Sequence, residues 1–141
     1  MPLGDCIRSD VVTASPDKTV DEIACMMENE NVGSVIITKN DRPIGIVTDR
    51  DLALRIAAKG RDSRKTAVRE IMTKDPFVVS KDDTLCSVVE RARDCGVRRM
   101  PVVDSNKKLV GIITMDDVLR LLSQEMGCVT DIIGKAGPSA R

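Results

Sequence analysis

Apolar residues recur at helical spacing in two matching stretches of the chain. Positions i, i+3, i+4 and i+7 are apolar in one stretch, and the same spacing returns 65 positions later (20 to 85). The two stripes are Val20, Ile23, Ala24 and Met27, then Leu85, Val88, Val89 and Ala92. One such stripe is typical of an amphipathic helix that packs on a core. Thr19 and Thr84 precede the stripes, so each predicted helix begins with a residue that can cap it.

Short runs rich in β-branched residues follow each predicted helix and predict two hairpins, because only a few turn-forming residues separate the members of each pair. The four runs are 34–38, 43–48, 100–104 and 109–114. A further short strand precedes each helix, at 10–13 and 77–80. A second helix is expected directly after each hairpin, beginning after Asp49 and Asp116. Each half of the chain therefore has the predicted order strand, helix, strand, strand, helix.

The two halves share a motif at the end of the hairpin. Residues 45–52 align with residues 111–118, and four of the eight positions are identical. Both copies contain Gly-x-x-Thr-x-x-Asp, which we call the signature. We expect a first repeat, a linker, a second repeat and a C-terminal tail that docks and then frays. Their expected bounds are 5–60, 61–70, 71–125 and 126–141. Because a repeat of this size buries little surface alone, the two are expected to share one core.

The signature has two interpretations that the sequence leaves open. A threonine hydroxyl at a strand-to-helix junction lies beside free backbone N–H groups, where anions are favoured. The aspartate three positions later can accept hydrogen bonds from two hydroxyl groups of a ligand. The same pattern also predicts a plain capping box, with threonine as N-cap and aspartate as its partner. The glycine allows a ligand or a facing strand to approach the backbone closely.

Two copies of this framework, each with the signature, resemble a tandem pair of CBS domains over roughly residues 5–125. The resemblance implies an α/β (α+β) fold of two pseudo-symmetric repeats, whose sheets pack together and leave two clefts. It also implies that the clefts bind AMP, ADP or ATP, or else NAD or S-adenosylmethionine. Thr48 and Asp51 would lie in one cleft, and Thr114 and Asp117 in the other. In this family the aspartate contacts ribose hydroxyls and the threonine contacts phosphate.

The family layout implies further ligand-facing residues. Arg98 and Arg99 resemble basic residues that reach nucleotide phosphates, for which the bidentate guanidinium is suited. They could equally be two solvated surface charges. The first repeat has no arginine at the matching place, so the two clefts are expected to differ. Thr13 and Ser80 resemble residues that touch the adenine side.

The strands supply the remaining candidate ligand-binding residues, which are Ser34, Val35, Met100 and Pro101. The chain has no Trp or Tyr and one Phe. A purine would therefore lie between aliphatic side chains such as Val12, Val35, Val79 and Met100, in an apolar pocket with a few polar anchors.

The amino-acid composition mainly excludes classes of function. Lys plus Arg and Asp plus Glu both number 22, so no basic surface for nucleic acid is expected. The absence of His excludes His-dependent catalysis and His-ligated metal. Five cysteines without a C-x-x-C spacing do not predict a disulfide framework or zinc site. The longest apolar run, 23–27, is too short for a membrane span, and no signal-peptide pattern is present, so a cytoplasmic protein is expected.

The sequence thus predicts a regulatory ligand-binding module with no catalytic residues, which signals to a separate partner protein. It requires no cofactor beyond an adenine nucleotide as regulatory ligand. A homodimer through the helices is expected from the family layout and from the prevalence of twofold assemblies. The alternative is a structural adaptor with the same fold and empty clefts. An enzyme is disfavoured because the paired carboxylates at 49/51 and 116/117 lack a nucleophile-base pair or a metal cluster.

Overall fold

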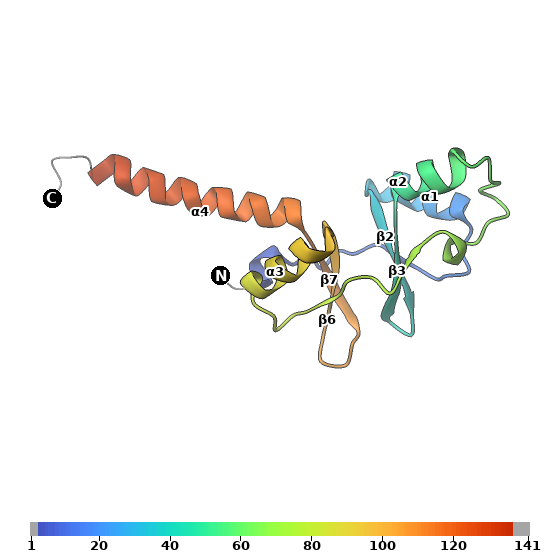
Figure 1. The fold of residues 1–141 in the computed structure, drawn as a ribbon, viewed down its shortest axis with the longest axis horizontal. Helices are drawn as coiled ribbons and strands as arrows, with labels where there is room; N and C mark the ends of the chain where they lie inside the picture. Colours follow the sequence, from blue (N-terminus) through green and yellow to red (C-terminus); the bar gives the residue numbers. More distant parts are fainter. Residues whose placement is uncertain (1–2, 137–141) are drawn as a thin grey trace.

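The computed structural model of the chain describes residues 3–136. Figure 1 shows two small sheets in the middle of the molecule, with helices on their outer flanks. The first sheet has the strand order β1-β2-β3-β4 and the second β5-β6-β7. The strands are β1 Thr13–Ala14, β2 Ser34–Lys39, β3 Arg42–Thr48, β4 Thr73–Lys74, β5 Val79–Ser80, β6 Arg99–Val103 and β7 Leu109–Thr114. The helices are η1 Leu3–Cys6, α1 Val20–Glu30, α2 Asp49–Leu52, η2 Ala53–Ala57, η3 Val68–Glu70, α3 Leu85–Cys95 and α4 Met115–Ala136.

The predicted α+β fold of two pseudo-symmetric repeats is confirmed. In each repeat a short strand pairs in parallel with the first strand of an antiparallel hairpin. The helix between them, α1 or α3, is the connection that a parallel pair requires. Both hairpins carry a register shift before their turn, at Ile37/Thr38 and at Val102/Val103. The two repeats therefore share the same strand pairing, including the register shift in the hairpin.

The helices begin and end where local chemistry requires. Thr19 accepts a hydrogen bond from the Glu22 N–H at 3.2 Å, and the Glu22 carboxylate accepts one from the Thr19 N–H at the same distance. Thr84 caps α3 by accepting a hydrogen bond from the Ser87 N–H at 3.2 Å, without a reciprocal bond. Asn31 and Gly96 adopt left-handed conformations, with φ of 52° and 65°, directly after α1 and α3. The predicted caps are confirmed, and left-handed residues stop both helices as they commonly do.

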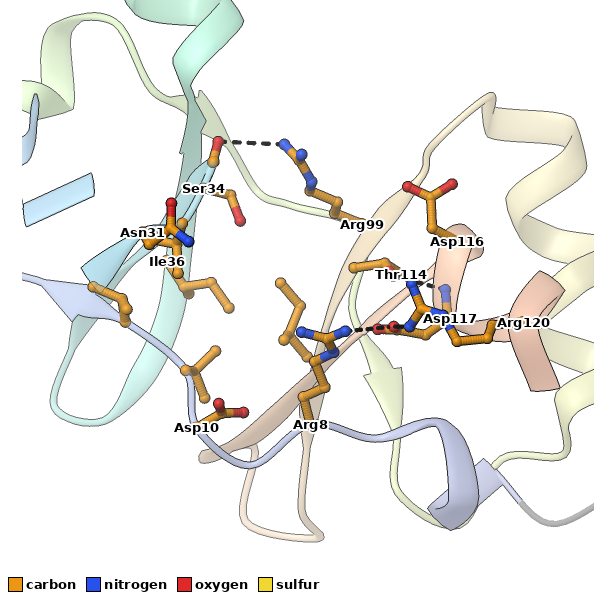
Figure 2. Close-up of a pocket in the computed structure, with 15 residues that line it drawn as sticks. Arg8, Asp10, Asn31, Ser34, Ile36, Arg99, Thr114, Asp116, Asp117 and Arg120 are labelled. Atoms are coloured by element: carbon orange, nitrogen blue, oxygen red, sulfur yellow. Dashed lines mark hydrogen bonds and ion pairs between the residues drawn. The ribbon is translucent and has the colours of Figure 1, made fainter. Parts of the chain in front are cut away.

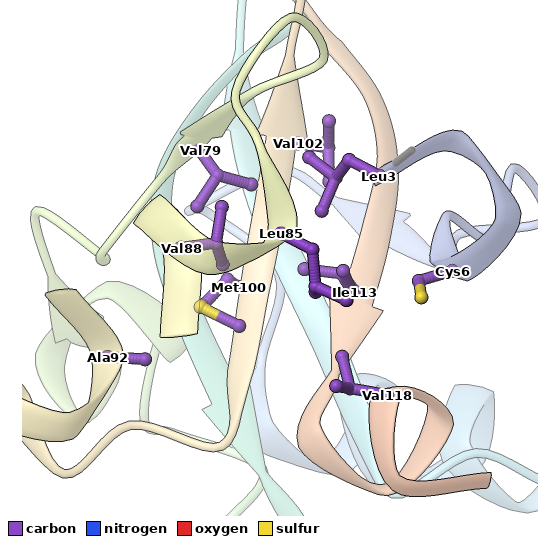
Figure 3. Close-up of a cluster of buried hydrophobic side chains, with 10 residues drawn as sticks. All are labelled: Leu3, Cys6, Val79, Leu85, Val88, Ala92, Met100, Val102, Ile113 and Val118. Carbon is purple, nitrogen blue, oxygen red and sulfur yellow. The ribbon is translucent and has the colours of Figure 1, made fainter. Parts of the chain in front are cut away.

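Two hydrophobic cores are present, where a single shared core was expected. Side chains alternate along each strand, so one face of each sheet packs against its own helices and the other faces the opposite sheet. The first core consists of Ala14, Val20, Ile23, Met27, Val35, Ile37, Val47, Ile56, Val68 and Ile71. The second core, drawn in Figure 3, consists of Leu3, Cys6, Val79, Leu85, Val88, Ala92, Met100, Val102, Ile113 and Val118.

The segment that precedes each repeat packs on the core of the other repeat. Leu3 and Cys6 belong to η1 at the beginning of the chain, yet they are buried in the second core. In Figure 1 this segment, coloured blue, lies beside α3 and α4. Val68 and Ile71, which lead into the second repeat, are buried in the first core. The predicted linker, 61–70, therefore includes a residue that completes the first core.

The signature glycines make this exchange possible. Arg8 and Ile112 exchange two backbone hydrogen bonds, each 2.9 Å long. A Cβ atom on Gly111 would lie 2.6 Å from the Arg8 carbonyl oxygen, so a larger residue has no room there. A Cβ on Gly45 would overlap the Met72 side chain, which precedes β4. The sequence predicted that this glycine lets either a ligand or a facing strand approach the backbone. In the structure it is a facing segment that approaches the glycine in each repeat.

The helices that follow the hairpins differ in length. The helix α2 continues as one turn of π-helix, η2, and Gly60, with φ of 65°, follows it. The helix α4 is longer than predicted, because residues 126–136 of the expected tail are helical. Gly127 and Gly134 suggested a tail, but a helix tolerates glycine at a cost of about 1 kcal/mol each. Residues 137–141 lie outside the described residues.

We predict that Gly111→Ala lowers the free energy of unfolding by about 1–3 kcal/mol, the usual cost of forcing an extra methyl into a packed site. Gly45→Ala should cost less, because the atoms nearest its Cβ belong to the flexible side chain of Met72. Urea denaturation of both variants checks this. Equal losses for the two would mean that the backbone of residue 8 does not constrain position 111.

Candidate functional site

A cleft of about 290 Å³ lies between the two repeats. Its volume is close to the lower end of small-molecule sites. Figure 2 shows that its walls come from both sheets, from the N-terminal segment and from the first turn of α4. Four of the predicted site residues line it, namely Ser34, Arg99, Thr114 and Asp117. Four charged residues that were not predicted to bind ligand also line it, namely Arg8, Asp10, Asp116 and Arg120.

Asp117 is the most constrained charged group in this cleft. Its side chain is 10% exposed, and its Oδ1 atom lies 2.8 Å from Arg8 Nη2 and 3.0 Å from Arg120 Nη1. Its backbone N–H donates to Thr114 Oγ1 at 3.1 Å, so Thr114 caps α4. Its Oδ2 atom is buried and has no hydrogen-bond partner among the described residues. A buried acceptor without a donor is costly, so a hydrogen-bond donor that reached this oxygen would be stabilising.

The charge state of Asp117 follows from these neighbours. Burial opposes ionisation of the carboxyl group, but the hydrogen bond from Arg8 and the positive charges of Arg8 and Arg120 outweigh it. The pKa of Asp117 is therefore lower than that of an ordinary aspartate. At neutral pH the side chain is a carboxylate, which accepts hydrogen bonds and does not donate them.

The signature of the first repeat is arranged differently. The Asp51 N–H donates to Thr48 Oγ1 at 3.2 Å, and the Thr48 N–H donates to Asp51 Oδ2 at 2.9 Å. The other carboxylate oxygen, Oδ1, lies 3.7 Å from Arg55 Nε. This is the capping box that the sequence left open, and it occupies the carboxylate that would otherwise face a ligand. Neither Thr48 nor Asp51 lines the cleft beside Asp117.

The two neighbouring arginines of β6 point to different places. Arg99 Nη1 reaches across the cleft and donates to the Gly33 carbonyl oxygen of the first repeat at 3.4 Å (Figure 2). A Cβ on Gly33 would lie 3.3 Å from Arg99 Nη2, so this glycine leaves room for the guanidinium. Arg98 is exposed and pairs with Asp116 Oδ1 at 3.2 Å. Of the two, Arg99 is the one that lines the cleft.

Five of the remaining candidates lie away from this cleft. Val35 and Met100 are fully buried in the two cores, because strand alternation turns them toward the helices. Pro101 is buried on β6 and does not line the cleft. Thr13 lines a separate hollow of about 360 Å³ beside the two hairpin turns. The Ser80 hydroxyl accepts a hydrogen bond from the Asp82 N–H at 3.2 Å and belongs to a turn.

The aliphatic wall of the cleft therefore differs from the expected one. Val12 is the one expected purine neighbour that lines it, whereas Val79, Val35 and Met100 are core residues. The wall is completed by Val11, Val32, Ile36 and Ile112. Ile36 follows the expected Val35 by one position along β2, and one position changes the face of the sheet.

Arg8 and Arg120 line the cleft, but the sequence analysis predicted neither of them, for different reasons. Arg8 reaches Asp117 only because the N-terminal segment crosses to the second repeat, and no local pattern indicates that crossing. Arg120 is three positions after Asp117 on the same helix, and an i,i+3 acidic–basic pair is a recognisable signal. The pairing of Arg120 with Asp117 could therefore have been predicted from the sequence.

Residues 3–136 contain neither a metal-binding cluster nor a membrane-spanning helix. No group of three or more Cys, Asp or Glu side chains lies together so that it could hold a metal ion. No helix in that range is long and apolar enough to cross a membrane. All five cysteines are free; Cys6 is buried in the second core, and burial raises the pKa of its thiol.

Comparison with known proteins gives a consistent match. A family model described as the CBS domain matches residues 3–58 and again residues 68–124. The uncharacterized protein MK0525 of Methanopyrus kandleri is 40% identical over 120 residues, which are 84% of this chain and 61% of that protein. The CBS domain-containing protein YhcV of Bacillus subtilis is 35% identical over 114 residues, which are 81% of this chain and 80% of that protein.

A solved structure extends this similarity to the fold. The crystal structure of the CBS domain pair of protein MJ0100, in complex with 5′-methylthioadenosine and S-adenosyl-L-methionine, superposes with a TM-score of 0.76. The two sequences are 25% identical, and the match covers 86% of this chain and 99% of the other. The similarity thus extends over most of both chains.

We predict that Arg8→Met raises the pKa of Asp117, because the variant removes a hydrogen bond and a positive charge from the carboxylate. Carbon-13 NMR titration of aspartate-labelled protein measures this pKa. The matched control is Arg98→Met, which removes a guanidinium bonded to Asp116 and should leave the pKa of Asp117 unchanged. An unchanged value in Arg8→Met would contradict the role given to Arg8.

The same pKa gives stability a pH dependence of known sign. The folded pKa lies below the ordinary value of about 3.9, so ionised Asp117 stabilises the fold above about pH 4, and this stabilisation is lost as the pH falls through the folded pKa. The difference in unfolding free energy between the wild type and Arg8→Met should therefore shrink below about pH 4. Urea denaturation at a series of pH values measures it.

Proposed function

This chain belongs to the CBS-domain family, and on that premise we propose that it is a regulatory module that binds an adenosyl ligand in the cleft beside Asp117. CBS domain pairs are regulatory modules. The ligand would be AMP, ADP or ATP, or else NAD or S-adenosylmethionine. The adenosyl compounds bound by the CBS pair of MJ0100 support this class of ligand.

One observation carries the proposal, namely the buried Oδ2 atom of Asp117 without a donor. A ribose offers two neighbouring hydroxyl groups, and a carboxylate can accept from both. The aliphatic side chains of Val12, Ile36 and Ile112 form an apolar wall on which a purine can pack without an aromatic partner. Arg99, on the same cleft, offers a guanidinium to a phosphate or carboxylate of the ligand.

We place the ligand in this cleft rather than beside Thr48 and Asp51. The Asp51 carboxylate already accepts the Thr48 N–H and lies beside Arg55, so ligand hydroxyls would have to displace a helix cap. Asp117 keeps one oxygen free of such bonds within the described residues. The phosphate-binding preference expected near Arg98 and Arg99 then belongs to the same cleft, through Arg99.

Binding would act by shifting the shape or dimer geometry of the module, which a separate partner protein reads. A homodimer through the helices is part of this proposal. We propose no catalytic step, because the carboxylates of Asp116 and Asp117 pair with arginines and the Thr114 hydroxyl is engaged as the cap of α4.

The second candidate function is a structural adaptor that dimerises and docks a partner without a small ligand. The exposed apolar residues of α4 are the observation that favours it. Calorimetry and thermal-shift assays with AMP, ADP, ATP, NAD and S-adenosylmethionine separate the two. No response to any of the five would favour the adaptor.

We predict that Asp117→Ala weakens binding of the adenosyl ligand by roughly 10- to 150-fold, because hydrogen bonds to a charged group contribute about 1.5–3 kcal/mol. Asp51→Ala should leave this affinity within about twofold and instead lower the stability of the fold by about 0.5–1.5 kcal/mol, through loss of the cap. Calorimetry and urea denaturation of both variants check this. The reverse result would place the ligand in the other cleft.

We predict that Arg99→Ala reduces affinity for ATP more than affinity for adenosine, by about tenfold or more, because a charge-assisted bond to phosphate is lost. Arg98→Ala is the matched comparison, since its guanidinium pairs with Asp116 in solvent and should contribute little. Competition calorimetry with the two ligands measures the ratio. Equal losses for ATP and adenosine in Arg99→Ala would remove the phosphate role.

A further inference from the structure

The C-terminal part of α4 leaves the body of the protein with its apolar side chains uncovered. Met115, Val118 and Leu121 pack on the second core. Beyond them every residue from Leu122 to Lys135 is exposed. Figure 1 shows this part of the helix extending away from both sheets. An exposed apolar stripe of this length on a protruding helix calls for a partner surface.

Five of the six large apolar residues that are exposed on α4 follow a heptad pattern, and the sixth, Ile132, lies beside the stripe and is 67% exposed. The five alternate at spacings of three and four residues, which places them on one narrow stripe of the helix. We call this stripe the α4 seam; its residues are Leu119, Leu122, Met126, Val129 and Ile133. Their exposed fractions range from 41% for Leu122 to 68% for Met126. The five positions cover about two heptads and alternate as the a and d positions of a two-stranded coiled coil do.

This part of the helix also has little stability of its own. It contains Gly127, Gly134 and the β-branched Val129 and Thr130, all of which are weak helix formers. An isolated helix of about 15 residues is near the limit of stability in water even when every residue favours helix. Helices of this kind are stabilised by packing of their apolar face. The structure therefore needs an occupant on the α4 seam.

We propose that the occupant is a second copy of this chain, whose α4 seam packs against the first in a two-stranded coiled coil. A heptad stripe is self-complementary, and a twofold pair of identical surfaces is the commonest closed assembly. Five side chains of this type bury on the order of 100 Å² each, so two helices bury about 1,000 Å². That area is the size at which an interface between proteins becomes stable.

Charge supports a protein partner of this kind over a lipid surface. No residue of the α4 seam is charged, and Asp131 and Lys135 fall at heptad positions away from it. A helix that lies on a membrane carries several Lys or Arg residues on its polar face. Between Leu121 and Ala136 there is one lysine, and it is balanced by Glu125 and Asp131. The seam therefore fits an uncharged helix face, which a second copy supplies.

The proposal names the surface of the homodimer in the proposed function and is independent of the adenosyl ligand. Sedimentation velocity and light scattering of the full chain without ligand test it. The variants are Met126→Asp, in the centre of the seam, and Gln124→Asp, two positions earlier and off the seam. Both place the same residue in the same part of the helix, so helix propensity is matched. Circular dichroism reports whether α4 remains helical.

We expect the wild type to be a dimer at about 50 μM, a concentration at which a micromolar interface is saturated. Met126→Asp should raise the dissociation constant about 100-fold or more, because two carboxylates would be buried without partners. It should also lose helical signal, whereas Gln124→Asp should match the wild type in both measurements.

Each other outcome overturns the proposal. A monomeric wild type removes both the α4 seam and the homodimer, and binding of that monomer to anionic vesicles would assign the stripe to a membrane. A dimer that survives Met126→Asp places the interface elsewhere. Adenosyl binding by Met126→Asp, measured by calorimetry, is expected to persist, so failure of the seam and failure of the cleft are told apart.

Discussion

The close approach of the N-terminal segment to Gly111 is the contact on which the rest of the structure depends. The Arg8 backbone bonds twice to Ile112 across a glycine that has no room for a Cβ. This pairing anchors η1, so that Leu3 and Cys6 can complete the second core. It also delivers the Arg8 side chain to Asp117. One backbone contact therefore joins the two repeats, completes a core and sets the electrostatics of the cleft.

The same contact explains why two nearly identical signatures behave differently. In the first repeat, Thr73 pairs with Ile46, in the place where Arg8 pairs with Ile112 in the second repeat. Threonine brings no charge, so no side chain crosses to attract Asp51, and its carboxylate closes a capping box on its own helix. Where arginine crosses, the carboxylate pairs with it through one oxygen, and the other oxygen is buried without a hydrogen-bond partner among the described residues. The difference lies in the crossing segment, outside the signature.

The sequence predicted the parts that depend on local chemistry. The repeat, the hairpins and the caps at Thr19 and Thr84 follow from periodicity and from hydrogen bonding within a few residues. The exchange of segments could not be predicted, because an amphipathic turn such as 68–72 shows only that it packs, not on which core. The sequence analysis also placed Val35 in the cleft, where the structure has Ile36. The two residues are equally apolar, so the sequence does not show which of them faces the cleft and which faces the core. The length of α4 was detectable in its heptad spacing, but two glycines obscured it.

The first turns of α4 carry both the proposed cleft and the beginning of the α4 seam. Asp117 lies in the first turn, and Leu119 is two positions later. Arg120 bonds to Asp117 and is the sequence neighbour of Leu119. A ligand that donates a hydrogen bond to the Asp117 carboxylate shares that group with Arg8 and Arg120, and an effect between two sites requires a contact that differs between bound and free states. The ion pairs of Asp117 lie within one helix turn of Leu119, so the proposed cleft and the proposed α4 seam meet at the beginning of α4.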